Sequence, residues 1–204
     1  MNIEFRPAHP GDCDQVVPLI HSSGPKTFRY VFSVDYSDQS LDFLRQAFIV
    51  GEGQFSYSEH WVIVADGTIV GCGSLANPDN NLSHMLQAVK QIFGFYGLLK
   101  GIGVLLRGLK VEQVIPPAKS GEAYICNLAA KPQGRGYGSR MIDHLIGIGQ
   151  SNNLTTASLD VADSNTNAKA LYARMGFREI VHRSAQRHYK WGQLEGHTYM
   201  TKDI

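Results

Sequence analysis

The sequence predicts one α/β domain, residues 1–204, built on a mixed, twisted β-sheet. Strand-like runs alternate with helical periodicities along the chain. Asp66-Gly67 separates two β-rich runs, as in a two-residue hairpin turn. A glycine-rich turn joins a strand-like run at 122–130 to a helical run at 139–150. At 204 residues the chain is long enough for one such domain with a substantial core.

The first third of the chain predicts a strand, two helices and the hairpin. Ile3 and Phe5 alternate with polar neighbours, which indicates a short strand. Pro10 and the apolar residues after it start a helix, and a second helix is predicted over 40–50. The aromatic segment 28–36 between them is predicted to be an irregular loop, packed on the core or, alternatively, lining a substrate site.

Residues 78–120 form a predicted helical insertion. Apolar side chains follow helical spacing over 82–96, whereas Gly94, Gly97, Gly101 and Gly103 should break or loosen the helix. Because three cations interrupt the apolar run, we do not expect the segment to span a membrane, which takes ~20 unbroken apolar residues. Packing on the core or on a second copy in a homodimer is the favoured interpretation. Covering an acceptor site and touching lipid are the alternatives.

The last third predicts strand, helix and two strands. In the strand at 155–161, apolar residues alternate with Ser158 and Asp160, so one face carries a carboxylate. A helix begins near Asn165 and ends at Gly176, which suits a left-handed stop. Two further strands are predicted around 178–182 and 197–201.

Composition narrows the partners. The chain has 19 basic and 18 acidic side chains, so a net charge of +1 gives no field that favours nucleic acid. Three widely spaced cysteines fit neither a disulfide framework nor a metal site. No basic region followed by an apolar run stands at the N-terminus, so no secretory signal is expected. We therefore expect a cytoplasmic protein without a metal.

The glycine turn predicts a phosphate ligand. Gly134, Gly136 and Gly138 stand at every second position before a helix, where backbone N–H groups lack intrahelical partners and the helix dipole favours anions. The spacing fails the GxGxxG pattern of dinucleotide folds, and no lysine completes a Walker loop. The phosphate ligand is therefore of another class.

Two motifs resemble signatures of the GNAT superfamily of acyl-CoA-dependent N-acetyltransferases. One is Gln133-Gly-x-Gly-x-Gly, and the other is Asn165-x-x-Ala168-x-x-Leu171-Tyr172-x-x-x-Gly176-Phe177. The resemblance implies a central sheet of about six to seven strands with splayed central parallel strands and helices on both faces. It also implies acetyl-CoA as cofactor and direct transfer of an acetyl group to a primary amine of a protein or small molecule. The alternative is a catalytically silent acyl-CoA-binding regulatory module.

By the same resemblance, cofactor-binding residues follow by position. Leu128, Ala129 and Ala130 would meet the pantetheine arm, and Asn165 would bond the arm or cap its helix. The pyrophosphate would lie on Gln133, Gly134, Arg135, Gly136, Tyr137, Gly138 and Ser139. Family members commonly have two more residues between the proline and the glutamine of this loop, whereas Pro132 runs directly into Gln133. This difference leaves open which of residues 128–130 meets the arm.

The resemblance also implies catalytic candidates. Tyr172 takes the position of the family's general acid, and a tyrosine with an ordinary pKa of about 10 carries its proton at neutral pH. Asp160 lies twelve residues before it, a spacing similar to that of the catalytic glutamate in ribosomal-protein N-terminal acetyltransferases. Glu122 is the rival base, and bound water can replace either. The segment 187–191 is also similar to a basic-aromatic stretch of those enzymes.

Overall fold

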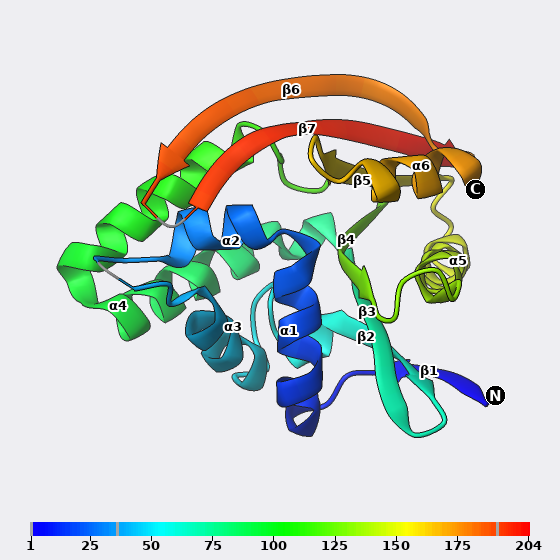
Figure 1. The fold of residues 1–204 in the computed structure, drawn as a ribbon, viewed down its shortest axis with the longest axis horizontal. Helices are drawn as coiled ribbons and strands as arrows, with labels where there is room; N and C mark the ends of the chain where they lie inside the picture. The colour runs from blue at the N-terminus through cyan, green and yellow to red at the C-terminus, as the bar shows by residue number, and fades with distance from the viewer. Residues whose placement is uncertain (1, 36, 191) are drawn as a thin grey trace.

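The computed structural model describes residues 2–35, 37–190 and 192–204, and within them seven strands form one sheet. The strand order is β1-β2-β3-β4-β5-β7-β6 (Figure 1). The strands are β1 (Ile3–Pro7), β2 (His60–Ala65), β3 (Thr68–Ala76), β4 (Glu122–Ala130), β5 (Thr156–Ala162), β6 (Arg178–Tyr189) and β7 (Gly192–Asp203). The predicted mixed sheet of six to seven strands is confirmed.

The centre of the sheet is its one parallel pair among the described strands. β4 and β5 pair in register only from Glu122–Tyr124 to Thr156–Ser158. Every other neighbouring pair is antiparallel, including the predicted β2–β3 hairpin at Asp66-Gly67. Both hairpin residues have positive φ, 47° and 80°, as the turn requires. The short parallel register means that β4 and β5 separate beyond Tyr124.

Helices cover both faces of the sheet (Figure 1). One apolar core packs α1 to α3 against β2 and β3, with Val62 and Cys72 pointing into it. The other packs α5 against Ile63, Ile125 and Leu159. Since neighbouring residues of one strand enter opposite cores, the period-2 pattern assigns each side chain to a face. The helices outside the insertion are η1 (Pro10–Asp12), α1 (Cys13–Ser23), α2 (Pro25–Phe32), α3 (Ser40–Ile49), η2 (Tyr57–Glu59), α5 (Tyr137–Ser151) and α6 (Thr166–Arg174).

The prediction of an irregular loop over 28–36 was wrong for residues 28–32, because Pro25–Phe32 forms helix α2. Pro25 stands in its first turn, where the missing N–H costs nothing. Phe28, Tyr30 and Phe32 are buried in the core with α1 and α3. Tyr36, at the end of the predicted loop, lies outside the described residues.

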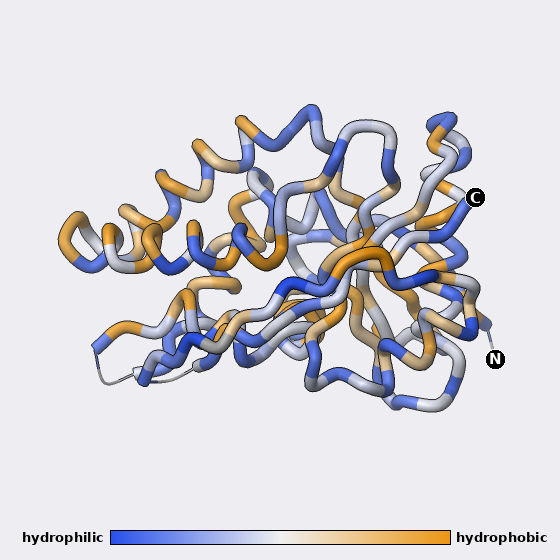
Figure 2. The backbone as a smooth tube through the Cα atoms, turned by 90° about the horizontal axis from the view of Figure 1, so that it is seen from above, coloured by the Kyte–Doolittle hydropathy of each residue, from blue (hydrophilic) through white to orange (hydrophobic). Residues whose placement is uncertain are grey.

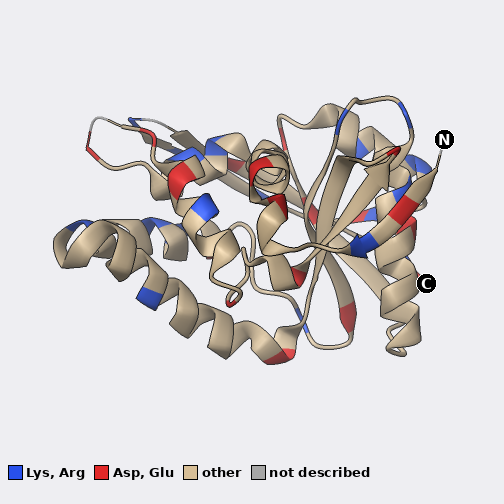
Figure 3. Cartoon of the chain, turned by 90° about the horizontal axis from the view of Figure 1, so that it is seen from below, with Lys and Arg blue, Asp and Glu red and all other residues tan. Residues whose placement is uncertain are grey.

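The insertion begins with η3 (Pro78–Asn80) and continues as α4 (Asn81–Glu112), which is bent sharply at Gly97. There φ is 71° and ψ is 173°, a conformation that glycine adopts readily and other residues rarely do. The two arms fold back on each other in a hairpin (Figures 2 and 3). Gly101 lies so close to the first arm that a Cβ there would be 2.7 Å from the Phe93 ring. Of the four glycines predicted to break the helix, only Gly97 does.

The last two strands are much longer than predicted. The predicted strands at 178–182 and 197–201 are one end of a long β6–β7 hairpin whose other end reaches α2 (Figure 1). There Gly192 packs directly on the α2 backbone, since a Cβ would lie 2.1 Å from Tyr30 N. Arg107 of α4 stacks over the Tyr189 ring, with its guanidinium carbon 4.3 Å from the ring centroid. One end of the molecule is thus assembled from three distant segments.

Candidate active site

The opening between β4 and β5 is the natural place for an extended ligand. Beyond Tyr124, the part of β4 that the structure describes has no register with β5. Ala129 and Ala130 pair with Cys72 and Gly71 of β3 on the opposite edge. The β5-side edge of residues 125–130 therefore offers backbone N–H and C=O groups to a chain that carries amides. Leu128, Ala129 and Ala130 all lie on this edge.

A local irregularity in β4 lies at the opening. Asn127 has a left-handed backbone with φ of 51°, which asparagine tolerates better than most residues. Its side-chain Nδ2 lies 3.2 Å from Nε2 of His60, whose Nδ1–H donates to the Ser56 carbonyl at 2.7 Å. Burial lowers the pKa of His60 to about 4, so its Nε2 is unprotonated and accepts from Asn127. Sequence analysis missed both residues, although an asparagine inside a strand is a signal of irregular backbone.

The glycine loop follows β4 directly and is open to solvent. Residues 131–136 are all exposed, and a Cβ at Gly134 or Gly136 would meet no atom within 4 Å. Both glycines have φ of 77°, and Gly136 caps the start of α5. Gln133 and Arg135 lie on this exposed loop, and Ser139 stands half-buried in the first turn of α5. The free N–H groups of that turn make the loop suitable for a pyrophosphate.

Tyr137 and Gly138 join this loop to the core. The Tyr137 side chain is buried with Met141 and Tyr172, so only its backbone is available to a ligand in the loop. Gly138 lies against α6, where a Cβ would be 3.6 Å from Leu171. The first turn of α5 is therefore fixed in place by packing behind the exposed glycines.

Helix α6 carries Asn165 at its start and Tyr172 near its end. The Asn165 side chain caps the helix by accepting a hydrogen bond from Ala168 N at 3.2 Å. Tyr172 is buried in the α5 core, and burial raises the pKa of its phenol to about 12. Because of this raised pKa, the Tyr172 hydroxyl keeps its proton at neutral pH. Gly176, with φ of 90°, ends the helix segment.

The two candidate bases lie together on the other face of the sheet. Ala123 and Ile125 point toward α5, so Glu122 and Tyr124 point away from it, and Asp160 of β5 does the same. The Tyr124 hydroxyl donates to Asp160 at 3.0 Å, and the Tyr199 hydroxyl of β7 donates to Glu122 in a short hydrogen bond. A polar cluster, Glu122, Tyr124, Asp160, Arg183 and Tyr199, thus lies on the face of the sheet opposite Tyr172.

Burial dominates the electrostatics of the polar cluster. It raises the pKa of Asp160, against the opposing effects of the Tyr124 hydrogen bond and of Arg183, whose Nη1 lies 3.2 Å from Asp160 Oδ1. Burial and the bond to Glu122 raise the pKa of Tyr199 to about 12. The phenols therefore stay protonated and act as donors. Because Tyr124 lies two residues after Glu122 in the same strand, the sequence pattern places both on one face. No local pattern predicts that Arg183 and Tyr199 lie beside them.

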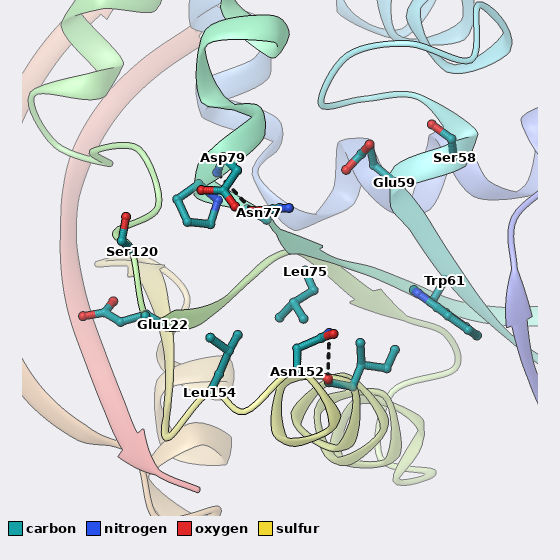
Figure 4. A pocket seen from close by; sticks show the side chains of 14 residues that line it. Ser58, Glu59, Trp61, Leu75, Asn77, Asp79, Ser120, Glu122, Asn152 and Leu154 are labelled. Atoms are coloured by element: carbon teal, nitrogen blue, oxygen red, sulfur yellow. Dashed lines mark hydrogen bonds between the residues drawn. The ribbon is translucent and has the colours of Figure 1, made fainter.

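A cavity of about 460 Å³ lies at the start of β4, at the opposite end of the strand from the glycine loop (Figure 4). Glu59, Asp79 and Glu122 line it together with apolar residues such as Leu75 and Leu154. Glu122 thus belongs both to the cavity wall and to the polar cluster. Within residues 2–35, 37–190 and 192–204, no three His, Cys, Asp or Glu side chains gather to hold a metal ion. Trp191, part of the basic-aromatic stretch noted above, lies outside the described residues.

These features together fit acetyl-CoA. The free β4 edge suits the amides of its arm, the exposed glycine loop suits its pyrophosphate, and the buried Tyr172 phenol lies on the side of the α5 core. Asn165 was predicted to bond the arm of the cofactor or to cap its helix, and in the structure its Oδ1 is engaged in the helix cap. Its Nδ2 donors are the atoms that a ligand would meet.

Several solved structures have a similar fold. An N-acetyltransferase from Staphylococcus aureus Mu50 aligns over 98% of this chain and 100% of its own, with a TM-score of 0.70 and 19% identity. A polyamine N-acetyltransferase from Drosophila melanogaster that forms N-acetylagmatine aligns over 100% of both chains, with a TM-score of 0.59 and 15% identity. The ribosomal-protein-S18-alanine N-acetyltransferase from Escherichia coli aligns over 100% of this chain and 94% of its own, with a TM-score of 0.54 and 16% identity.

The sequence itself decides the family. No protein with a curated description matches it. Residues 26–177, well over half of the chain, match the profile of the Acetyltransferase (GNAT) family, and this range contains the β4 edge, the glycine loop, Asp160 and Tyr172. The chain belongs to the GNAT family of acetyltransferases.

Proposed function

We propose that this GNAT N-acetyltransferase acetylates a primary amine of a small molecule or peptide by direct transfer, without a covalent enzyme intermediate. One observation carries the proposal. Tyr172 is buried and protonated on the α5 side of the sheet, and two carboxylates of the separating strands β4 and β5 lie on the other side. A proton donor and proton acceptors can therefore act at one opening from opposite faces.

The cofactor of the family is acetyl-CoA, which supplies an acetyl group activated as a thioester. Leu128, Ala129 and Ala130 bind its arm through the free edge of β4 in this proposal. Residues 133–139 hold the pyrophosphate through backbone N–H groups, with Arg135 adding charge. The Leu128 N–H, next to the left-handed Asn127, is positioned to polarise a carbonyl oxygen without any side chain.

Tyr172 serves as the general acid. Its Oη keeps a proton because burial raises the pKa of the phenol to about 12. A proton held at this atom is available to a thiolate as it leaves. Leu171, beside it, packs against Gly138 at the start of α5, which fixes α6 relative to the glycine loop.

An incoming ammonium must lose a proton before it can attack, and Asp160 or Glu122 accepts it. Burial raises the pKa of Asp160, which makes this carboxylate a better proton acceptor than an exposed aspartate. Tyr124 and Tyr199 connect the two carboxylates to the opening through hydrogen bonds. Water bound at these groups can carry the proton.

The acceptor class follows from charge near the polar cluster. Glu59, Asp79 and Glu122 line the cavity at the start of β4, which favours a ligand that arrives as a cation. Proteins of similar fold are described as forming N-acetylagmatine or as a ribosomal-protein-S18-alanine N-acetyltransferase. Agmatine, a polyamine and a peptide with N-terminal alanine are therefore the first acceptors to test.

The test measures CoA release from acetyl-CoA with this panel of amines. We expect Tyr172→Phe to lower kcat by about 10²–10⁴-fold, the range for loss of a general acid, with acetyl-CoA binding retained. Tyr57→Phe is the matched control, because the Tyr57 ring packs on Phe48 of α3 and does not belong to the polar cluster or to the cavity wall. Full turnover in Tyr172→Phe would remove the acid assignment. Binding of acetyl-CoA without acetylation of any amine would favour the silent regulatory module instead.

A further inference from the structure

The α4 hairpin exposes apolar side chains on both arms. Leu99 is 87% exposed and Leu98 is 68% exposed, close to the bend at Gly97. The second arm buries its other side, where Gly101 and Val104 face the protein. It therefore has apolar residues on both faces, unlike an ordinary surface helix. The exposed apolar residues are Leu82, Met85, Leu86, Leu98, Leu99, Ile102, Leu106 and Leu109.

We call these eight exposed residues the α4 patch. They are more numerous than the single, scattered apolar residues that an ordinary protein surface carries. Figure 2 shows the orange segments along both arms of the hairpin, at one end of the molecule. So many exposed large apolar side chains on one hairpin indicate an interaction site. The choice of occupant then depends on the length and charge of the arms.

Length excludes a simple transmembrane helix. The segment Pro78–Glu112 is long and apolar enough to cross a membrane by length and composition, and only 22% of its most apolar window is buried. Gly97 divides it, however, into arms of at most about 24 Å at 1.5 Å rise per residue. A bilayer core is about 30 Å thick, so neither arm crosses it. An apolar segment that is too short to span the bilayer can lie in the interface instead.

The charge of the hairpin selects the surface. Between Asp79 and Glu112 every charged side chain is a cation, namely Lys90, Lys100, Arg107 and Lys110 (Figure 3). Arg107 turns inward, donating to the Val31 and Ser33 carbonyls, and Lys100 lies 2.7 Å from Asp35. Lys90 lies midway along the first arm and Lys110 near the end of the second, and both are exposed. An anionic surface matches this pattern, whereas pairing with the same face of a second copy would bring cations together.

We propose that the α4 patch binds the surface of an anionic lipid bilayer. The exposed leucines enter the boundary between headgroups and acyl chains, and Lys90 and Lys110 contact the anionic headgroups. The hairpin lies flat, and the sheet with its opening stays in water. This inference is independent of the proposed amine acetylation, because binding to a bilayer requires neither cofactor nor turnover.

The experiment is flotation of the full chain with vesicles of phosphatidylcholine alone and with 30% phosphatidylglycerol. We expect flotation with the anionic vesicles and at least about tenfold weaker binding for Leu99→Ser/Leu106→Ser, since each leucine loses its apolar burial. Ile49→Ser/Ile180→Ser is the control, because these residues are comparably exposed on α3 and β6. It should float like the unchanged protein.

Lys90→Glu/Lys110→Glu separates charge from apolarity. This variant should lose the preference for anionic vesicles, as should the unchanged protein at high salt. Failure of the unchanged protein to float with 30% phosphatidylglycerol would overturn the proposal. So would equal loss in the Ile49→Ser/Ile180→Ser control. A dimer seen by light scattering that Leu99→Ser/Leu106→Ser converts to monomers, without flotation, would assign the α4 patch to a second copy instead.

Discussion

Asn127 and His60 illustrate how single residues shape the opening. Asn127 interrupts β4 with a left-handed backbone, and neutral His60 holds its side chain. His60, the first residue of β2, is buried and also bonds the Ser56 carbonyl at the start of η2, so it connects η2 to the strand irregularity. The Leu128 N–H, which the proposed mechanism uses, follows directly in sequence. The geometry of that N–H therefore depends on a histidine of another strand, β2.

His60 makes stability depend on pH with a definite sign. Burial lowers its folded-state pKa to about 4, below an unfolded value of about 6.5. The stability from keeping the imidazole neutral is present above pH 6.5 and is lost as pH falls toward 4. We expect the free energy of unfolding to fall by about 2 kcal/mol between pH 7 and pH 5 from this group. Urea titrations at both pH values measure it, and an equal fall in His60→Gln would contradict the assignment.

Asp160 should control the acidic side of the pH–rate profile. Its pKa is raised by burial, so kcat/KM should decline as pH falls through a value above that of an ordinary aspartate. We expect Asp160→Asn to lower kcat/KM by about 10²-fold and to remove this acidic decline. Glu122→Gln is the matched loss of a carboxylate in the same polar cluster. If Glu122→Gln removed the decline and Asp160→Asn did not, the roles of the two carboxylates would be exchanged.

At the scale of elements, α5 depends on close approach to β4. A Cβ at Gly149 would lie 2.7 Å from the Ala123 Cβ, whereas one at Gly147 would meet nothing within 4 Å. The absence of a side chain at Gly149 thus lets helix and strand pack closely. Since β4 and the start of α5 form the cofactor cradle, this packing also positions the glycine loop.

Two substitutions in α5 test this approach. We expect Gly149→Ala to lower the free energy of unfolding by about 1–3 kcal/mol, because the helix must move away from β4. Gly147→Ala, in the same helix, should raise it by up to about 1 kcal/mol, since alanine is the better helix former. Chemical denaturation of both variants gives the comparison. Equal effects would mean that α5 does not depend on contact at Gly149.

Elements whose signals are local could be predicted from the sequence. The bounds of β4, the Asp66-Gly67 hairpin and the stop at Gly176 follow from short-range chemistry. Helix α2 and the full length of β6 and β7 could not, because their packing on each other sets them. The motif residues Gln133 to Ser139 and Tyr172 were found in the same way, and their roles stay predictions. Arg183, Tyr199 and His60 come from other strands, so no local pattern shows their contacts with the opening.

At the scale of the whole molecule, the two proposed sites are separated in space. The sheet opening and glycine loop lie at the end with α5 and α6, and the α4 hairpin projects at the other end (Figure 1). Arg107 connects the hairpin to α2 and β6 through the Val31 carbonyl and the Tyr189 ring. An anchored hairpin can thus hold the protein at a bilayer while the opening stays accessible.

The place of β7 between β5 and β6 has a consequence for biosynthesis. β5 gains its antiparallel neighbour only when Gly192–Asp203 has been translated, since β6, made earlier, lies one position further out. Tyr199, which bonds Glu122, also belongs to this segment. A nascent chain on the ribosome therefore has the glycine loop and Tyr172 long before it has the complete polar cluster. The complete polar cluster therefore forms only after the strand that is synthesised later has been inserted between β5 and β6.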